Sequence, residues 1–532
     1  MMRTRRQFIK EIAAGSAALA LAACTPGTTG TSPSASAAAR PKSGGTLTVG
    51  NGFDVGGLDP TTGSGAVNEY FHQHMIDRLL YAGRDLKLRP GLAERWETAP
   101  DQKSVTLFLR KGVTFQDGTA LDAEAVRWTF ERNMTHPRTV HTRALAPVAN
   151  VQVVDPTTVR INLKEPSSPF VAQLTTTLGA IMSRAEVEKQ GDNFGKGPHK
   201  AGSGPFVMQE LVSNDHVTYT KNPNWWGRDE FGGQLPYVDR LVIRIVPDST
   251  GRFTNVRTGN VDAIYEVAAE DLQLAASEPS LVVAMVPSTS WQELTLNHRA
   301  GRPFNDVRYV KAVANALDRD EIVRVAYKGT ASVGFSPISP LHFAYDPNFK
   351  PYPKPNLDTA RALVSQVGKG PLTFELEYEG GDTGILQDVQ LMQAQLKKAD
   401  ITMTLKALPR AQWTSNYTGG LFVDASLAAN SGGGNVDPDV RFYDFRHSKG
   451  RSNYGKYVNA EVDRLLDQNR AISDQAQRTD LLRKAQQISE ADDQCGIVIH
   501  WHNSYAVFVK QVKGWEPHPV TRPTFENAWV DR

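Results

Sequence analysis

The chain has 532 residues, more than one hydrophobic core usually supports, so two or three domains are expected. Hydrophobic residues make up 40% of it and charged residues 22%, which is ordinary for a globular protein that folds in water. Residues 1–23 carry four basic residues and one acidic residue, so they account for the net charge of +2; the nearly neutral remainder gives no electrostatic reason to expect nucleic acid as a partner.

Residues 1–23 have the pattern of an export signal. The twin-arginine pair Arg5-Arg6 precedes an apolar stretch over residues 12–23, which is shorter than the roughly 20 residues needed to cross a bilayer. Residues 21–24 (LAAC) match a lipoprotein box, in which the thiol of Cys24 is acylated and becomes the mature N-terminus. The alternative is an ordinary cleaved signal in which Cys24 is incidental. The two motifs together predict an extracytoplasmic lipoprotein, in the periplasm or on the cell surface, whose only membrane anchor is the acyl group.

A tether and the first elements of a folded body follow the signal. Residues 24–43 are mostly Thr, Ser, Pro, Ala and Gly, so they cannot bury enough surface to fold and are predicted to be a flexible tether. A first strand is predicted over residues 45–50. A helix is predicted over residues 67–80, because Phe71, Met75, Ile76 and Leu79 fall on one side of it.

Strands and helices alternate from there on. Strands are predicted over residues 104–109, 151–154, 158–163 and 240–246, and Asp117-Gly118 marks a turn. Asp122 stands where it can cap the N-terminus of a helix. This mixed order predicts an α/β protein with layered sheets and helices packed against them.

A second body is predicted to begin near residue 291. Residues 291–297 alternate as a strand, residues 299–304 form a turn, and Asn305 or Asp306 caps a helix. Asp318 and Glu321 have the spacing of a capping box, which begins another helix that Gly329 stops. Two late helices are predicted around residues 462–466 and 481–488, and the last strands, over residues 497–509, return to the first body.

Three chemically reactive side chains lie close together near the C-terminus. Cys495 precedes an apolar run, so we expect a buried small side chain rather than a nucleophile. His500 and His502 are two residues apart in a predicted strand and therefore share a face. They could ligate a metal with a third partner, but a structural pair beside Trp501 is the preferred interpretation, and no metal site is predicted.

Several motifs occur in a fixed order along most of the chain. The first group comprises residues 89–97 (RPGLAERWE), 105–110, 113–118 and 122–132, and the second comprises residues 202–206 (GSGPF) and 221–226 (KNPNWW). Residues 259–262 (GNVD) form the third group, and residues 303–308 (PFNDVR) with 316–322 form the fourth. In this order the motifs resemble those of the extracytoplasmic solute-binding proteins of ABC importers, family 5, whose members carry peptides, nickel, opines and some sugars. Most of these residues form turns, caps and core positions, so they indicate a fold more than a ligand.

The resemblance implies an α/β fold of the two-lobed periplasmic-binding-protein-like type (type II, cluster C) with an extra subdomain in the first lobe. Residues 44–80, 204–290 and 505–532 would form lobe I, residues 81–203 its inserted subdomain, and residues 291–504 lobe II. Hinge closure around a solute in the cleft between the lobes would create the form that a membrane permease recognises. The resemblance implies a monomer whose partners are a small solute or peptide and the permease subunits, without a cofactor.

The resemblance also indicates where ligand residues would lie. Peptide-binding members have an Asp shortly before an acidic-Pro pair, and this Asp accepts the amino terminus of the ligand. Here the pair is Asp437-Pro438, but the amine-binding position is occupied by Gly434, which weakens a conventional peptide assignment. Glycines 432–434 either let the backbone approach a ligand closely or form a plain turn. Asn430 is a further candidate in the same segment.

Aromatic and acidic residues complete the predicted ligand site. Trp413 lies where related binders place a pocket-wall aromatic, although a core position is the alternative. Trp291 and Glu293 share a face of the strand that enters the second lobe. If that face is the cleft, Trp291 stacks on the solute and Glu293 accepts from an ammonium group. Trp225 and Trp226 are interpreted as structural, because they belong to a fold motif.

Catalysis is not predicted. The chain contains no nucleophile elbow, zinc-protease helix, phosphate loop or dinucleotide-binding glycine pattern, although a glycosidase pair of carboxylates cannot be recognised from spacing alone. The preferred function is capture of a small solute for an ABC importer, with short peptides first, opine-like or glycan-derived compounds next, and metal chelates less favoured. A sensor that works without a transporter is the third class.

Overall fold

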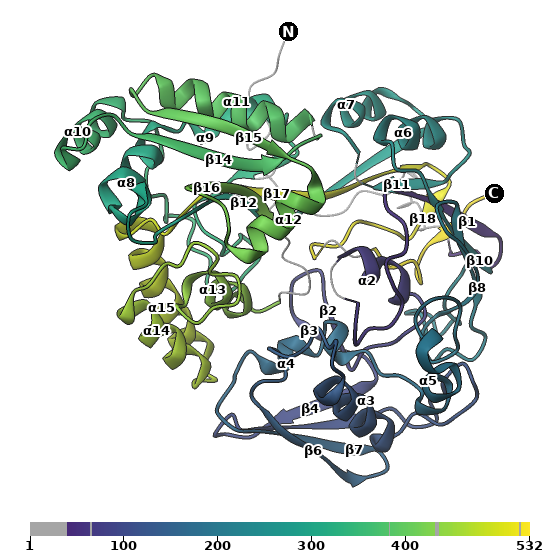
Figure 1. The fold of residues 1–532 in the computed structure, drawn as a ribbon. Helices are drawn as coiled ribbons and strands as arrows, with labels where there is room; N and C mark the ends of the chain where they lie inside the picture. The colour runs from purple at the N-terminus through teal and green to yellow at the C-terminus, as the bar shows by residue number, and fades with distance from the viewer. Residues whose placement is uncertain (1–39, 64–65, 266, 382, 431–435, 521–522) are drawn as a thin grey trace, which may run out of the picture. The chain divides into compact units, whose positions relative to one another are not determined.

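The computed structural model describes residues 40–63, 66–265, 267–381, 383–430, 436–520 and 523–532, and residues 41–532 form one compact unit. Strands and helices alternate along this unit, as the sequence predicts (Figure 1). Within the described ranges, no helix has both the length and the apolar character needed to span a membrane.

The largest sheet of the fold is mixed and contains eleven described strands. Its order is β15-β14-β16-β12-β17-β11-β1-β10-β9-β8, and β13 pairs with β17 beside this path. The strands are β1 (Thr46–Asn51), β8 (Phe206–Val212), β9 (His216–Lys221), β10 (Arg240–Ile245), β11 (Ala263–Tyr265), β12 (Leu281–Leu296), β13 (Ala331–Val333), β14 (Thr373–Glu379), β15 (Thr402–Leu408), β16 (Ala425–Asn430) and β17 (Gly496–Val509).

Two long antiparallel strands, β12 and β17, connect the two halves of this sheet (Figure 1). The N-terminal part of β12 pairs with the C-terminal part of β17, which also pairs with β11. The C-terminal part of β12 pairs with β16, so that Trp291 lies opposite Asn430. The register shifts between Pro287 and Trp291, where the strands pass from one half to the other. Both strands belong to both halves, so β12 begins ten residues before the predicted start of the second body at residue 291.

A second, four-stranded antiparallel sheet has the order β4-β5-β7-β6 and packs against helix α3. Its elements are β4 (Ala93–Thr98), β5 (Ser104–Leu109), β6 (Val148–Asp155), β7 (Thr158–Leu163) and α3 (Ala123–Thr135). The carboxylate of Asp122 accepts a 3.0 Å hydrogen bond from the Ala125 amide at the start of α3, which confirms the predicted cap. Two small pairs, β2 (Leu80–Ala82) with β3 (Leu88–Pro90) and β18 (Val512–Lys513) with β19 (Trp529–Val530), lie outside both sheets.

The remaining helices cover the strands and build separate apolar cores. One core joins α8, α10 and α11 to β12, β14, β15 and β16, and another joins α13, α14 and α15. The helices are α2 (Ala66–His72), α4 (Phe170–Gln173), α5 (Arg184–Gln190), α6 (Ser249–Arg257), α7 (Ala269–Ser277), α8 (Val307–Ala316), α9 (Arg319–Ala326), α10 (Leu357–Val367), α11 (Thr383–Lys397), α12 (Arg410–Gly419), α13 (Pro438–Arg446), α14 (Ala460–Arg470) and α15 (Gln475–Gln486).

The predicted helix over residues 67–80 is wrong in its second half. Helix α2 ends at His72, and Met75, Ile76 and Leu79 lie beyond it although all three are fully buried. Their backbone is held by other segments: the amide of Gly204 donates to the Met75 carbonyl, and the amide of Leu79 donates to the Gly179 carbonyl. Residues 73–75 form a turn and no helix follows before β2, so the buried residues of an irregular segment match a helical spacing by chance.

The predicted capping box of α9 is half formed. Asp318 accepts from the Glu321 amide at 2.9 Å, as predicted. The reciprocal bond is replaced, because the side chain of Gln395 accepts from the Asp318 amide and donates to the Glu321 carboxylate at 2.8 Å. A side chain from α11 therefore satisfies the groups that a capping box would pair locally.

Candidate functional site

Trp291 and Glu293 lie on one face of β12, in a fully buried ion-pair network. The Trp291 indole Nε1 donates to a Glu293 carboxylate oxygen at 2.9 Å. The guanidinium of Arg446 donates to Glu293 at 2.9 Å and to Glu490 at 2.5 Å, and all three charged side chains are at most 3% exposed. Glu293 therefore already has a cationic partner within the protein.

Trp413 and Asn430 meet at Tyr417. The rings of Trp413 and Tyr417 are stacked with their centroids 5.4 Å apart, and Trp413 Nε1 donates to the Ser426 hydroxyl at 3.2 Å. The Tyr417 hydroxyl donates to Asn430 Oδ1 at 3.2 Å. The Asn430 Nδ2 group is shielded from solvent and has no hydrogen-bond partner among the described residues. Because Asn430 also lies opposite Trp291, the fold brings four of the predicted site residues together: Trp291, Glu293, Trp413 and Asn430.

Asp437 lies at the N-terminus of α13, where it has two structural contacts. Its carboxylate accepts from the Asp439 amide at 3.0 Å, which caps the helix. It also forms a bidentate ion pair with Arg478 at 2.7 and 2.8 Å, and both side chains are at most 10% exposed. Gly434, Cys24, Arg5 and Arg6 lie outside the described residues.

Two arginines near the predicted site residues were not recognised from the sequence as candidate ligand contacts. The side chain of Arg441, one turn into α13, makes no hydrogen bond or ion pair with any described residue, and its Nε is shielded from solvent. Burial, followed by the charge of Arg451, lowers the pKa of Arg441 to about 10, while the nearby Tyr454 and Tyr417 act in the opposite direction. A single arginine in a helix of mostly polar residues has no sequence pattern that distinguishes it from an arginine on the surface.

Arg143 is the second arginine and comes from a distant segment. It forms an ion pair with Asp444, and its guanidinium lies 5.8 Å from the ring centroid of Tyr443. Burial, followed by the charges of Arg470 and Arg451, lowers the pKa of Arg143 to about 9. The region around Asn430 and α13 is thus rich in guanidinium groups, which bind carboxylates and carbonyl oxygens.

The two histidines of β17 lie in one cluster with Tyr327, in which His500 is fully buried and the other two side chains are half-buried. The ring centroids of His500 and His502 are 4.5 Å apart, and that of Tyr327 is 4.0 Å from His500. Burial lowers the pKa of both histidines, to about 4 for His502. In the described part of the chain, no group of three or more His, Cys, Asp or Glu side chains is placed to hold a metal ion. Cys495 is buried, as predicted.

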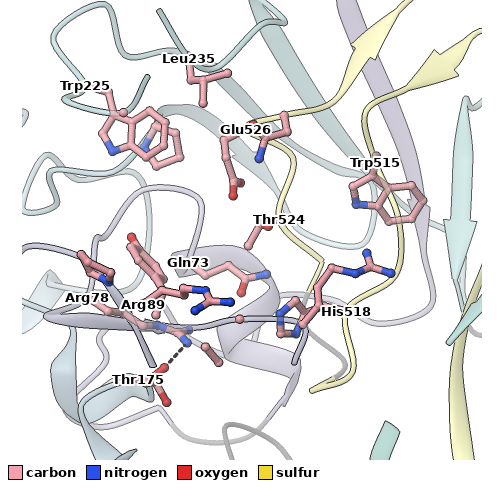
Figure 2. Close-up of a pocket in the computed structure, with 18 of the residues that line it drawn as sticks. Gln73, Arg78, Arg89, Thr175, Trp225, Leu235, Trp515, His518, Thr524 and Glu526 are labelled. Carbon is pink, nitrogen blue, oxygen red and sulfur yellow. Dashed lines mark hydrogen bonds between the residues drawn. The ribbon is translucent and has the colours of Figure 1, made fainter. Parts of the chain in front are cut away.

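A cavity of about 820 Å³ has none of the predicted ligand residues in its lining, although two of its lining residues, Ala82 and Val520, pack in one apolar cluster with Val436, the neighbour of Asp437. We call it the Arg78 cavity. Its lining comes from residues 73–90, Thr175, Pro205, residues 225–235 and residues 514–527. Figure 2 shows Trp225 and Leu235 on one side of the view and Arg78 and Thr175 on the opposite side, with Glu526 and Thr524 between them. The predicted residues and this cavity are therefore two separate candidates for a ligand site.

Trp225 and Trp226, which were predicted to be structural, belong to a hydrogen-bond network in the wall of the Arg78 cavity. Both indole Nε1 groups donate to the carboxylate of Asp77, at 3.2 and 2.8 Å. The same carboxylate accepts from the hydroxyls of Tyr81 and Ser203 at 2.8 and 2.9 Å, so four donors satisfy one buried charge. The two tryptophans hold this network and also line the cavity.

Comparison with known proteins connects this fold to one family. Residues 87–453 match the family model of the bacterial extracellular solute-binding proteins, family 5 (middle region). The chain is also similar to the glutathione-binding protein GsiB of Salmonella paratyphi A, with 26% identity over 451 residues that cover 83% of this chain and 86% of the relative.

Solved structures share the fold at lower identity. The periplasmic binding protein DppA of Helicobacter pylori, in complex with the peptide STSA, has a TM-score of 0.79 and 23% identity over 92% of this chain and 99% of its own. NikA of Brucella suis, in complex with Fe(III)-EDTA, has a TM-score of 0.81 and 21% identity over 91% of this chain and 100% of its own. These likenesses confirm the predicted two-lobed, periplasmic-binding-protein-like α/β fold. Because the family model matches more than half of its length, the chain belongs to the family 5 bacterial extracellular solute-binding proteins.

Proposed function

We propose that the protein is the receptor of an ABC importer, which captures a small solute, with oligopeptides as the first candidate, and delivers it to a membrane permease. Membership of a solute-binding family over residues 87–453 is the observation that carries this proposal. A large folded body behind an export signal fits a receptor that is held close to its permease. The protein acts as a monomer without a cofactor.

The proposed topography follows from the N-terminal motifs. Arg5 and Arg6 direct export, Cys24 carries the lipid anchor, and residues 24–43 are the tether. Lobe I comprises residues 44–80, 204–290 and 505–532, with residues 81–203 as an inserted subdomain and residues 291–504 as lobe II. Replacing Cys24 with Ser should release the protein from membranes and abolish incorporation of labelled fatty acid, whereas an Arg5→Lys/Arg6→Lys variant should stay in the cytoplasm. An unchanged distribution of either variant would contradict the assignment.

The proposed solute site lies around Asn430, Trp413 and Arg441. Asn430 Nδ2 and the guanidinium of Arg441 are donors without partners among the described residues. Trp413 stacks on Tyr417, whose hydroxyl contacts Asn430. A buried donor without an acceptor costs about 1–3 kcal/mol, so an oxygen of a bound solute would recover this free energy. A peptide carbonyl or carboxylate supplies such an oxygen.

Recognition of a ligand amine by Glu293 or Asp437 is less favoured within this proposal. Both carboxylates are buried in ion pairs, Glu293 with Arg446 and Asp437 with Arg478. A ligand ammonium would have to compete with a guanidinium that is already in place. Trp291 and Gly434 remain proposed neighbours of the solute, and the acceptor-rich end of the ligand is expected to face Arg441.

A thermal-shift screen tests the function directly. Peptides, opines, oligosaccharides and metal chelates should be titrated against the purified protein, because a ligand that binds only the folded state raises the unfolding midpoint with concentration. We expect a saturable rise with at least one peptide. A rise with none of the four classes would contradict a receptor function, and turnover of a substrate without saturable binding would favour an enzyme.

Solutes other than peptides are the second candidate class of ligand. A relative is a glutathione-binding protein and a protein of the same fold was solved with Fe(III)-EDTA, so opine-like, glycan-derived and metal-chelate ligands belong in the screen. A receptor that signals without a transporter would bind a solute equally well. Deleting an ABC permease should abolish uptake of the bound solute only if the protein feeds that transporter.

A further inference from the structure

The Arg78 cavity contains two charges of opposite sign, shielded at least in part from solvent, that the described protein residues leave unpaired. The residue Arg78 is 7% exposed, and its Nη1 donates to the Thr175 carbonyl at 2.7 Å. Its Nη2 has no hydrogen-bond partner within the described part of the chain. No carboxylate there lies within ion-pair distance of Arg78, although a guanidinium can bind a carboxylate through two parallel hydrogen bonds.

Glu526 is the opposite charge. It lines the same cavity, and among the described residues no cationic group lies within ion-pair distance of it. Burial raises the pKa of Glu526, whereas the Thr524 side chain lowers it through a hydrogen bond. The paired charges of the cavity, Arg84 with Glu516 at 2.7 Å and Arg89 with Asp85 at 2.9 Å, belong to exposed side chains. Arg228, which also lines the cavity and has no ion pair among the described residues, is exposed as well, so Arg78 and Glu526 are the more buried charges of the lining.

The walls between these two charges are apolar and aromatic. Trp225, Trp515 and Leu235 are each at most 7% exposed and line the cavity (Figure 2). The Nε1 group of Trp515 is a further donor without a partner among the described residues. A volume of about 820 Å³ lies in the range of about 300–1,000 Å³ that is usual for small-molecule sites, which are mostly apolar with a few converging polar groups.

We propose that the Arg78 cavity is a second ligand site that binds a small zwitterion with an apolar body, an amino acid or a very short peptide. Its carboxylate would pair with Arg78, its ammonium group with Glu526, and its apolar side chain would contact Trp225 and Trp515. Each of the two charges would then gain a partner, which offsets the cost of leaving it unpaired. None of the residues of the proposed solute site around Arg441 lines this cavity, so variants can test the two sites independently.

Three ligands with the same phenyl ring test the proposal on the unmodified protein. L-phenylalanine carries both charges, 3-phenylpropanoate lacks the amine, and 2-phenylethylamine lacks the carboxylate. We expect saturable binding of L-phenylalanine in isothermal titration calorimetry and at least about tenfold weaker binding of the other two, because each has lost one charge-assisted pair. Equal affinities for all three, or no binding of L-phenylalanine at millimolar concentration, would overturn the proposal.

Variants of Arg78 and Glu526 then test which group of the ligand each of these two side chains contacts. Glu526→Gln should weaken L-phenylalanine by about tenfold and leave 3-phenylpropanoate unchanged, whereas Arg78→Met should weaken both. Arg78→Lys keeps the charge if Arg78→Met does not fold, and it should bind more weakly because its ammonium group lacks the planar fork. Unchanged L-phenylalanine affinity in Glu526→Gln would overturn the proposal.

An Arg441→Ala variant separates this proposal from the proposed function. It should retain the affinity for L-phenylalanine, because Arg441 lies outside the cavity. Loss of L-phenylalanine binding in Arg441→Ala together with normal binding in Arg78→Met would assign the amino acid to the Arg441 site and contradict a second site. The screen for importer solutes is unaffected by either result.

Discussion

At the residue scale, buried charges define the region around the predicted solute site. Arg446 forms ion pairs with two carboxylates, Glu293 and Glu490, that are at most 1% exposed. Arg478 neutralises Asp437 in a similar way. Such networks add little net stability over apolar residues, but removing one partner leaves an uncompensated buried charge. Charged side chains that are paired within the protein are therefore interpreted as structural, and unpaired ones as candidate ligand contacts.

Replacing Arg446 should therefore be strongly destabilising. Arg446→Met leaves Glu293 and Glu490 facing each other without a cation, and we expect the free energy of unfolding to fall by about 3 to 5 kcal/mol in urea denaturation. Arg410→Met is the matched control, since the Arg410 side chain is 78% exposed, and it should change stability by less than about 0.5 kcal/mol. A loss below about 1 kcal/mol in Arg446→Met would show that the network is not needed for folding.

Asp388 should make stability depend on pH. Its carboxylate accepts from Tyr327 at 2.9 Å and from the Gln292 amide, and burial raises its pKa from 3.8 to about 7. Between about pH 4 and pH 7 the folded state therefore keeps a proton on Asp388 that the unfolded state has released. The contribution of Asp388 to the free energy of unfolding is complete below about pH 4 and is lost as the pH rises towards 7.

Asp388→Asn provides the comparison, because its side chain stays neutral at every pH. The stability of the unmodified protein minus that of the variant should fall between about pH 4 and 7, by up to about 1.4 kcal/mol per pH unit. Unfolding curves recorded at several pH values measure this difference. Parallel pH profiles of the two proteins would show that Asp388 is ionised in the folded state.

At the element scale, the local patterns of the sequence predicted seven of the nineteen described strands and the caps at Asp122, Asp306 and Asp318. The strands over residues 104–109 and 158–163 and the cap at Asp122 depend on alternation and on one local hydrogen bond, so neighbouring residues contain the information. The helix beyond His72 and the second half of the Asp318 box were not predictable, because segments distant in sequence replace the local bonds. The candidate site was predicted in part for the same reason: strand and loop positions were recognisable, whereas Arg441 and the Arg78 cavity arise only from packing.

The GSGPF motif shows how a sequence signature encodes such a long-range contact. A Cβ atom on Gly202 would lie 1.8 Å from the Met75 carbonyl oxygen, so the two backbones approach closely only at a glycine. Gly202→Ala should lower the free energy of unfolding by about 3 kcal/mol, because backbone atoms must shift to admit the methyl group. Gly197→Ala is the control, since no atom lies within 4 Å of its Cβ position. Equal midpoints in thermal unfolding would contradict the close approach.

At the scale of the whole molecule, polar contacts join the segment over residues 81–203 to the helices around α13. Arg143 pairs with Asp444, and the Ser168 amide donates to the Arg470 carbonyl at 2.8 Å. In a two-lobed binding protein, contacts of this kind hold the closed form around a solute.

Arg143→Ala should accordingly shorten the lifetime of the solute complex. We expect the dissociation rate to rise by about fivefold, equivalent to about 1 kcal/mol for a partly exposed ion pair, with a smaller effect on association. Surface plasmon resonance with the solute found in the screen measures both rates. Arg184→Ala removes an ion pair within one helix and should leave them unchanged. Identical dissociation rates of Arg143→Ala and the unmodified protein would exclude a closing role for this contact.

The most direct measurement is the dissociation constant of the best solute from the screen, determined by isothermal titration calorimetry for the unmodified protein, Arg441→Ala and Lys449→Ala. A receptor that binds its solute beside Asn430 and Arg441 should give saturable one-to-one binding, weakened at least about tenfold in Arg441→Ala because a charged hydrogen-bond donor is lost. Exposed Lys449 should contribute nothing. Equal dissociation constants in all three proteins would contradict the proposed site, and the absence of saturable binding would contradict the receptor function itself.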